Sequence, residues 1–367
     1  MAMYCPGFPI LQPGIGAIQG DVYLPAEVQH VLWGRLPCAA DAPVLTVAPG
    51  ATVTIDTISH EGVLEDQGKD PLGYFGGHGV PAEAVLSDAI AVARDLARDV
   101  KRDGPHVVTG PILVEGAEVG DLLALTVLET TPRVPYGVIS NRHGRGALPG
   151  ELPRTPETVS VFASIYERDG HLVGRLPLVA DGEPVVEFPL YPFLGIMGVA
   201  AAGDDRPHSV PPGPHGGNID INLLGPGSTL YLPVQVPGAL AYVGDPHFAQ
   251  GDGEVALTAL EASLRVTLRF DLVKRADALA EFGEVLGPLG RADGYLVPTG
   301  MDPDLDEAVR ACVRQALSLI QARWGMAEHL AYAYLSAATD FRISQVVDLV
   351  TGVHARIREA DFERIER

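Results

Sequence analysis

The stretch "ASLRVTLRFDLVKR", residues 262–275, alternates apolar and polar side chains along its length. Successive side chains of a β-strand point to opposite faces, so the alternation predicts a strand with one buried face and one face in water. Related patterns predict further strands at 44–58, 107–130, 159–166, 172–179, 184–188, 229–236, 239–243 and 254–270. The first of these has a Pro-Gly pair between two alternating runs, which is a hairpin pattern.

The composition also favours a fold made of many short strands. The chain has 367 residues, with 42 glycines and 31 prolines to form turns. We therefore expect a mainly β fold, a β-sandwich or jelly roll, that is α+β overall. Apolar residues at helical spacing predict helices at 81–100, 302–325, 326–338 and 343–355. The expected organisation is a β-sandwich core at 1–290 with a helical insertion near 81–102, followed by a helical C-terminal subregion at 291–367 that packs on the core.

Charge and cysteine content narrow the expected partners and compartment. The formal net charge is −21, and an acidic surface repels phosphate backbones and anionic lipid, so we expect neither a nucleic-acid nor a membrane partner. The three cysteines form no CxxC pair, which suits a reducing, cytoplasmic compartment. No basic residue precedes Arg35, unlike in a signal peptide. The least polar long stretch, 188–203, contains Pro189 and Pro192 and is too short to span a bilayer.

Acidic and imidazole side chains gather in four stretches, at 56–62, 203–209, 214–220 and 244–254, each flanked by strand-like sequence. Loops at one end of a sandwich can converge, so these stretches could build one pocket. The last of them belongs to "GDPHFAQGDGEV", residues 244–255. It is either a solvated turn before a strand or a site for a metal ion or a general base.

Individual residues of these stretches are open to both a structural and a functional interpretation. His247 lies between Asp245 and Gln250, and zinc sites combine imidazole with carboxylate ligands. The spacing matches no HExxH or paired CxxC motif, so a hydrogen-bonded structural role for His247 stays open. Glu254, at the entry to a strand, suits a general base, with a solvated carboxylate as the alternative. Asn218 follows a Gly-Gly pair and can either bind an amide or cap a turn.

Other hydrolytic machinery finds little support in the sequence. Lys69 and Lys101 lie in polar settings and Lys274 ends a strand, so none has the apolar, glycine-serine setting that a Ser–Lys amidase needs. Cys312 lies in an amphipathic segment, Cys5 lies near a terminus, and no G-x-S-x-G elbow occurs. Metal-activated water remains as the means of hydrolysis.

Two further segments add polar groups. "SHEGVLEDQG", residues 59–68, could supply a ligand or a substrate contact. "NRHGRG", residues 141–146, is locally basic and could bind an anion or pair with an acidic neighbour across an oligomer interface. We favour the second interpretation of this loop.

The sequence resembles the acetamidase/formamidase family in "TGPILVEGAEVGDLLALTV", "PHGGNIDINLLGPGSTLYLPVQVPGAL", "GDPHFAQGDGEVALTALE" and, more weakly, the C-terminal end. The resemblance runs from about residue 40 to residue 357. It implies hydrolysis of short aliphatic amides to carboxylate and ammonia, a divalent metal, a mostly β fold of jelly-roll type and a homo-oligomer. The family pattern carries over to His215, Gly216, Gly217, Asn218, Asp220, Asp245, His247, Gln250, Asp252 and Glu254.

We therefore predict a metal-dependent amidohydrolase that acts on a small carboxamide such as formamide or acetamide, as a homodimer or larger homo-oligomer. The expected ion is zinc, with calcium as the alternative. Glu254, or failing that Asp252, is expected to take the proton of the attacking water. The expected substrate contacts are Asn218, Gln250 and His60, and the expected metal ligands are His215, Asp220, His247 and Asp56.

Two other functions stay open. A β-sandwich can hold Ca²⁺ through oxygen ligands and act as a binding module. Asp204, Asp205, Asp245 and Asp252 are available for that role. Hydrolysis of an ester or of another small amide, including a cyclic one, is the second alternative.

Overall fold

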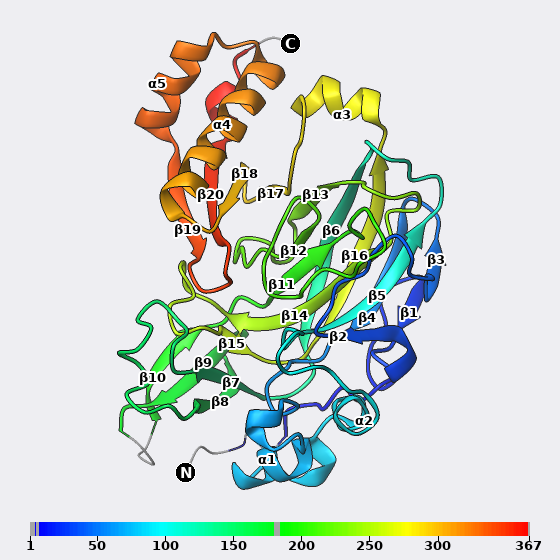
Figure 1. The fold of residues 1–367 in the computed structure, drawn as a ribbon, viewed down its shortest axis with the longest axis vertical. Helices are drawn as coiled ribbons and strands as arrows, with labels where there is room; N and C mark the ends of the chain where they lie inside the picture. Colours follow the sequence, from blue (N-terminus) through cyan, green and yellow to red (C-terminus); the bar gives the residue numbers. More distant parts are fainter. Residues whose placement is uncertain (1–3, 5–6, 180–183, 366–367) are drawn as a thin grey trace.

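The computed structural model describes residues 4, 7–179 and 184–365, and two large β-sheets dominate it (Figure 1). In spatial order, the nine-stranded sheet contains β1 (Val22–Leu24), β4 (Ala51–Asp56), β16 (Leu264–Val273), β6 (Leu122–Pro132), β13 (Thr229–Pro233), β17 (Leu289–Ala292), β18 (Tyr295–Asp302), β20 (Thr351–Arg358) and β19 (Asp340–Gln345). The eleven-stranded sheet contains β10 (Pro184–Pro189), β9 (His171–Pro177), β8 (Val159–Arg168), β7 (Tyr136–Asn141), β15 (Leu260–Glu261), β14 (Ala241–Ala249), β11 (Phe193–Gly198) and β12 (Gly216–Asn218). In this second sheet β5 (Val107–Val114) pairs with β14, and β2 (Val31–Trp33) and β3 (Leu45–Val47) pair with β5. The predicted mainly β, α+β class is confirmed.

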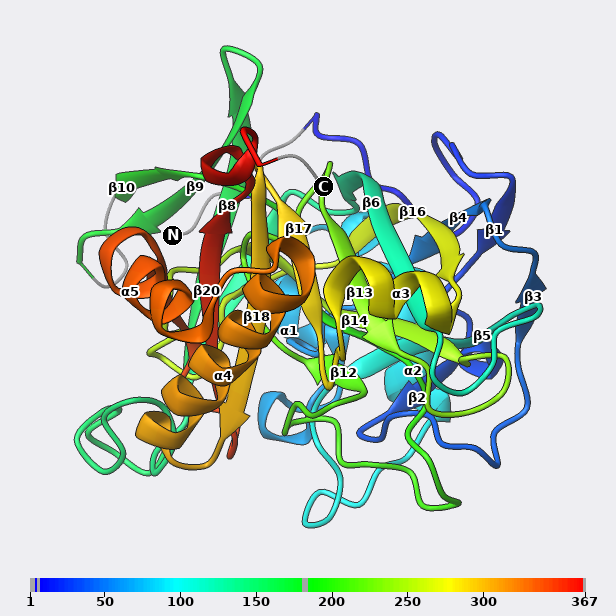
Figure 2. The same ribbon diagram turned by 90° about the horizontal axis from the view of Figure 1, so that it is seen from above.

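The α-helices lie toward two ends of the molecule, α1 and α2 at one end and α3 to α5 at the other (Figure 1). They are α1 (Pro71–Gly77), α2 (Ser87–Asp95), α3 (Arg275–Phe282), α4 (Leu305–Trp324) and α5 (Glu328–Ala338), with short 3-10 helices at Val28–His30, Glu65–Gln67, Ala82–Ala84 and Glu359–Phe362. Figure 2 shows α4 beside β18 and β20, and Cys312 of α4 packs with Val353 and Ala355 of β20. Within the described ranges, no helix has the length and apolar content needed to cross a bilayer.

The main hydrophobic core lies between the two sheets. Val266 and Leu268 of β16 are fully buried, together with Met197 of β11 and Val243 of β14 in the other sheet. Alternation along β16 thus places one face in the core, as predicted. Its other face is not uniformly in water, because Arg265 is buried there.

Two local predictions are wrong because distant segments determine the strand pairing. The runs at 44–58 are strands, but β3 pairs in parallel with β5 while β4 pairs with β1 and β16, so they form no hairpin. The segment at 343–355 is not a helix: it contains the end of β19, a turn, and the start of β20, which pairs with β18. The division near residue 290 stays a prediction, and β18 to β20 beyond it continue the nine-stranded sheet.

A candidate metal and catalytic site

The stretch at 244–255 begins as a strand rather than as a solvated turn. β14 runs as far as Ala249 and carries Asp245 and His247, which are 3% and 0% exposed. The Nε2 atom of His247 lies 3.0 Å from Asp245 Oδ2 and 3.1 Å from Oε1 of Glu261, a residue of the neighbouring strand β15. Asp245 and His247, which looked like loop residues, are therefore buried within the sheet and contact Glu261.

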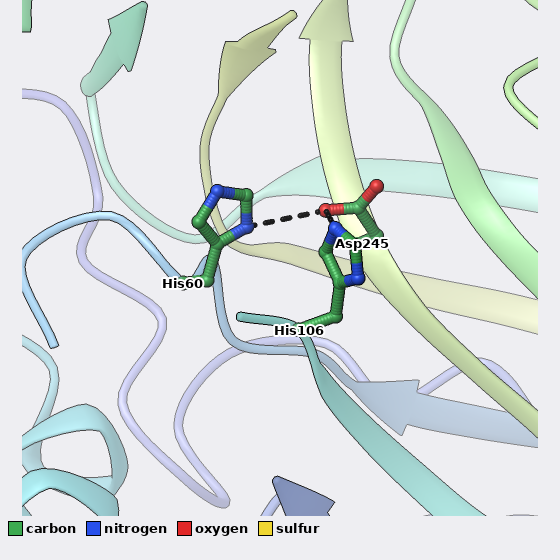
Figure 3. A group of neighbouring side chains, drawn as sticks. All are labelled: His60, His106 and Asp245. Carbon is green, nitrogen blue, oxygen red and sulfur yellow. Dashed lines mark ion pairs between the residues drawn. The ribbon is translucent and has the colours of Figure 1, made fainter. Parts of the chain in front are cut away.

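Two more imidazoles face the other oxygen of Asp245 (Figure 3). His60 Nδ1 lies 3.3 Å and His106 Nε2 lies 3.8 Å from Asp245 Oδ1. Oε2 of Glu261 lies 3.8 Å from His60 Nδ1. A hydrogen bond between an imidazole nitrogen and a carboxylate oxygen is usually shorter than these separations. The ligand atoms of a tetrahedral ion with ~2.0–2.1 Å bonds, in contrast, lie about 3.4 Å apart. These separations suit ligands of a shared ion, and the other ring nitrogen of His106 is fixed 3.0 Å from Ser209 Oγ.

Two groups of possible metal ligands are thus Asp245, His247 and Glu261, and His60, His106 and Asp245. A third group lies next to them, on the side of a large cavity. Ligand atoms of Asp220, His247 and Glu254 lie within 4.8 Å of one another. Glu254 and Gln250 also line a cavity of about 840 Å³. Among the described residues, several buried oxygens of the cluster have no hydrogen-bond partner: both of Asp220, Oδ1 of Asp245, Oε2 of Glu261 and Oδ2 of Asp348. Buried acceptors without partners are costly, so these atoms mark a place that suits a cation.

The backbone around the cluster is unusual. Asp220, Asp245 and Glu254 have φ angles of 48°, 48° and 47°, a region that residues other than glycine rarely adopt. Such conformations gather at functional sites, where the surrounding structure holds them in place. Gly195 of β11 is required for space, because a Cβ atom there would lie 2.7 Å from both Asp245 Oδ2 and His247 Cε1.

Burial and mutual repulsion raise the pKa values of several carboxyl groups in this cluster. Burial raises the pKa of Glu254 well above its usual value, and the nearby Asp348 carboxylate adds to the effect. Burial likewise raises the pKa of Asp220, which faces both of these acids. The pKa of Asp348 rises to about 7, chiefly through burial. A carboxylate with a raised pKa is a better proton acceptor at neutral pH than an exposed one.

The two histidines drawn in Figure 3 have pKa values shifted in opposite directions. Burial alone would lower the pKa of His60, but the carboxylates of Glu261, Asp245 and Glu61 outweigh it and raise the value to about 10. For His106 burial dominates, and its pKa falls to about 4 although Asp245 opposes the change. His106 is therefore neutral at pH 7, the form in which an imidazole binds metal, whereas His60 must give up a proton to do so.

Five residues singled out from the sequence meet in this cluster, namely His60, Asp220, Asp245, His247 and Glu254. Gln250, predicted to contact substrate, holds two segments of the cluster together. Its Oε1 lies 3.1 Å from His247 Nδ1, and its Nε2 donates to the backbone oxygens of Asp220 and Ser344 at 2.9 Å and 3.1 Å.

Other predicted site residues lie outside the three groups of possible ligands. Asp252 sits at the cavity rim, where it accepts hydrogen bonds from Asn222 and Arg342, both at 3.1 Å. Asn218 is buried on β12, and its Oδ1 has no hydrogen-bond partner among the described residues. His215, in the adjoining turn, is held neutral by burial, which lowers its pKa to about 4.

Asp56, predicted as a ligand, lies in a buried ion-pair network. It faces Arg265 across the β4–β16 pair, with Oδ1 2.6 Å from Nε and Oδ2 2.9 Å from Nη2. The hydroxyl of Tyr23 donates to Oδ2 at 2.6 Å. Arg133 Nη2 lies 3.5 Å from Oδ2 and 2.7 Å from Asp88. Cross-strand register thus pairs Asp56 with Arg265, and Arg133 lies close to the same carboxylate.

Replacing Asp56 by asparagine is expected to lower the free energy of unfolding by about 3–5 kcal/mol, because it leaves buried guanidinium charge without its partner. Urea unfolding measures the change. The control is Asp271→Asn, which removes the partly exposed pair with Arg269 (2.6 Å) and should cost at most about 1 kcal/mol. Normal stability with loss of bound metal in Asp56→Asn would instead make Asp56 a ligand.

Sequence reasoning missed three members of the cluster: His106, Glu261 and Asp348. His106 and Glu261 are single polar residues at or near strands, with no second ligand-type residue beside them. Asp348 lies in the segment predicted as a helix. Backbone bonds from Gly253 N to Ser344 O (3.1 Å) and from Val346 N to Gly253 O (3.2 Å) bring this C-terminal turn to the site.

The basic loop at 141–146 is connected to the site through Glu61. Arg142 donates to Asp66 Oδ2 at 2.7 Å and to Glu61 Oε1 at 3.3 Å. Glu61 Oε1 in turn lies 3.4 Å from His60 Nε2. Burial acts to raise the pKa of Glu61, but His60 and Arg142 outweigh it and lower the value to about 2. Arg142 is therefore paired within this chain, in contrast to the interface role favoured from the sequence.

Solved structures share this fold. The acetamidase from Bacillus halodurans superposes with a TM-score of 0.72 at 24% identity, covering 94% of this chain and 100% of that one. The gamma lactamase from Delftia acidovorans superposes with a TM-score of 0.54 at 22% identity, covering 93% of this chain and 92% of the other. At these identities the likeness concerns the fold alone.

Sequence comparison relates the chain to amidases. It is 30% identical to the formamidase of Methylophilus methylotrophus over 228 residues, which are 51% of this chain and 56% of that protein. It is 29% identical to the acetamidase of Mycolicibacterium smegmatis over 242 residues, 52% of this chain and 59% of that protein. The chain thus spans little more than half the length of these relatives. The family model described as "Acetamidase/Formamidase family" matches residues 87–206 and 200–357, well over half of the sequence, so the chain belongs to the acetamidase/formamidase family.

Proposed function

We propose that this protein is a metal-dependent amidohydrolase that converts a carboxamide into a carboxylate and ammonia. One observation carries the proposal above all others. A buried cluster of imidazoles and carboxylates with unpartnered oxygens ends, at Glu254, on a large cavity. The names of the relatives, formamidase and acetamidase, support the same reaction class.

The donor set fits a divalent ion. We assign the ion to His60 Nδ1, His106 Nε2 and Asp245 Oδ1, with Glu261 Oε2 as the nearest additional donor. Two imidazoles with carboxylates are typical zinc ligands, whereas calcium prefers oxygen ligands alone. When bound, such an ion would acidify a water molecule and polarise the amide carbonyl. Zinc is therefore the proposed ion.

We assign the transfer of the proton from water to the leaving nitrogen to Glu254. Glu254 lies between the acids and the cavity, and its raised pKa suits it to accept a proton from the attacking water. The same carboxyl then gives that proton to the amide nitrogen, which leaves as ammonia. Gln250 and His247 hold the adjoining segments in place, since Gln250 bonds both His247 and the backbone of Asp220.

The oligomeric state and the cellular location are part of the proposal. We retain a homo-oligomer and a cytoplasmic location, supported by the family resemblance and by the lack of a CxxC pair among the cysteines. A calcium-binding module would need its acidic ligands to lie close to one another. Asp204 and Asp205 instead line a separate surface hollow with Arg35 and Arg206, away from Asp245.

Ammonia release from a panel of amides tests the proposal. The metal-loaded enzyme should release ammonia, stripping by a chelator should remove most of the activity, and stoichiometric zinc should restore it. A catalytically dead Glu254→Gln protein, treated in parallel, controls for contaminating amidases. Full activity in metal-free protein would overturn the metal assignment, and absence of ammonia with every amide would overturn the reaction.

A further inference from the structure

The cavity beyond Glu254 is much larger than a small amide requires. Its volume is about 840 Å³. A molecule of three or four heavy atoms displaces two or three waters, on the order of 60–90 Å³. Acetamide would therefore fill a small part of the space, whereas drug-sized ligands occupy pockets of ~300–1,000 Å³.

The wall of this cavity is mainly apolar. Phe188 lies in β10, Leu190 directly follows that strand, and Leu223 comes from the loop after β12. Tyr191 and Val255 also line it, and they are 70% and 63% exposed. Large apolar side chains left in water beside a catalytic group indicate a surface that a ligand covers.

The charged groups of the wall limit which ligand fits. Asp252, Glu254 and Asp293 are acidic, and among the described residues that line the cavity there is no lysine or arginine. The Asp252 carboxylate is paired with Arg342 at 3.1 Å. A substrate that carries its own carboxylate or phosphate would meet acidic groups there without a basic partner, whereas a neutral apolar group would displace water from the wall.

We propose that the substrate is a primary carboxamide with a bulky, neutral apolar acyl group, such as an aryl or branched alkyl group, which occupies this cavity while the amide lies at Glu254. This inference rests on the proposed amide hydrolysis and specifies its substrate class. Burial of one methylene group gains on the order of 4-fold in specificity. The phenyl ring of phenylacetamide should therefore raise kcat/KM at least ~100-fold over acetamide.

Two glycines supply a matched pair of variants. Gly225 lines the cavity, has no positive φ, and a Cβ built on it would meet only Pro192 O, at 3.6 Å. Gly287 is equally open, with only Pro214 Cα at 4.0 Å, but it lines a different cavity of about 360 Å³. Gly225→Leu should fill part of the substrate cavity, and Gly287→Leu makes the same change elsewhere.

The experiment measures kcat/KM for acetamide, isobutyramide and phenylacetamide with the zinc-loaded proteins. Gly225→Leu is expected to lower the value for phenylacetamide at least ~10-fold and that for acetamide less than ~3-fold, while Gly287→Leu changes neither. If Gly225→Leu does not fold, Tyr191→Ala takes its place. This variant removes an exposed aromatic side chain from the cavity wall, and it should lower kcat/KM for phenylacetamide more than that for acetamide. Equal effects of Gly225→Leu on both amides, or faster turnover of acetamide than of phenylacetamide by the unaltered enzyme, would overturn the inference.

Calorimetric binding to the Glu254→Gln protein separates this inference from the proposed reaction. Phenylacetamide should bind at least ~10-fold more tightly than acetamide. If no amide releases ammonia, the reaction is overturned, and tighter binding of phenylacetamide would still support the cavity assignment. If phenylacetamide binds no more tightly than acetamide, the cavity does not hold the acyl group, whatever the turnover.

Discussion

Replacing Glu254 by glutamine is expected to lower kcat by ~10²–10⁴, the contribution typical of a general base. The amide has nearly the same shape but cannot accept the proton of the attacking water. KM and metal content should change little, because Glu254 is not among the ligands that we assign to the ion. Steady-state kinetics with elemental analysis of the same samples measures both effects.

Asp252→Asn provides the comparison for this variant. Asp252 was the alternative base from the sequence, but it is bonded to Arg342 and Asn222 at the cavity rim. Its loss should therefore affect kcat much less than the loss of the Glu254 carboxylate. A larger defect in Asp252→Asn than in Glu254→Gln would reverse the assignment, and retention of more than about a tenth of the activity by Glu254→Gln would exclude it as the base.

Replacing His106 by alanine is expected to remove bound metal and lower kcat/KM by more than ~100-fold, beyond the ~10–100-fold typical of residues that only support a ligand. His106 is buried, burial lowers its pKa to about 4, and its Nε2 lies 3.8 Å from Asp245 Oδ1, so its loss removes one of the three assigned ligands. Excess zinc should restore part of the activity, since affinity rather than folding is impaired. Metal titration followed by activity assays measures this.

His78→Ala is the control for loss of a buried or half-buried imidazole. His78 stacks on Phe162 with ring centroids 4.8 Å apart and belongs to none of the three groups of possible ligands. This variant should keep its metal. If His106→Ala keeps a full equivalent of tightly bound metal while His247→Ala loses it, the ion belongs to the group of Asp220, His247 and Glu254 instead.

The strands were predictable to the extent that their sequences alternate. Leu264 to Phe270 follow a period of two, and this pattern alone identified β16 and its buried face. The partners of the strands were not predictable in this way. β3 and β4 are neighbours in sequence yet belong to different sheets, and the part of 343–355 that lies in β20 pairs with β18, a distant partner.

Members of the buried cluster were predictable where several ligand-type residues lie close together in sequence. Asp220, His247 and Glu254 stood out for that reason. His106 and Glu261 come to the cluster by strand pairing, β5 and β15 both lying beside β14, and no local pattern marks them. Asp56 shows the reverse: it lies near His60 in sequence, but strand register pairs it with Arg265.

The most direct test of the central claim is an anomalous difference map from crystals of the zinc-loaded protein, recorded on both sides of the zinc absorption edge. We expect one peak bounded by His60 Nδ1, His106 Nε2 and Asp245 Oδ1, with bonds of ~2.0–2.2 Å. A peak elsewhere in the chain, or no peak in protein that hydrolyses amides at full rate, would contradict the account.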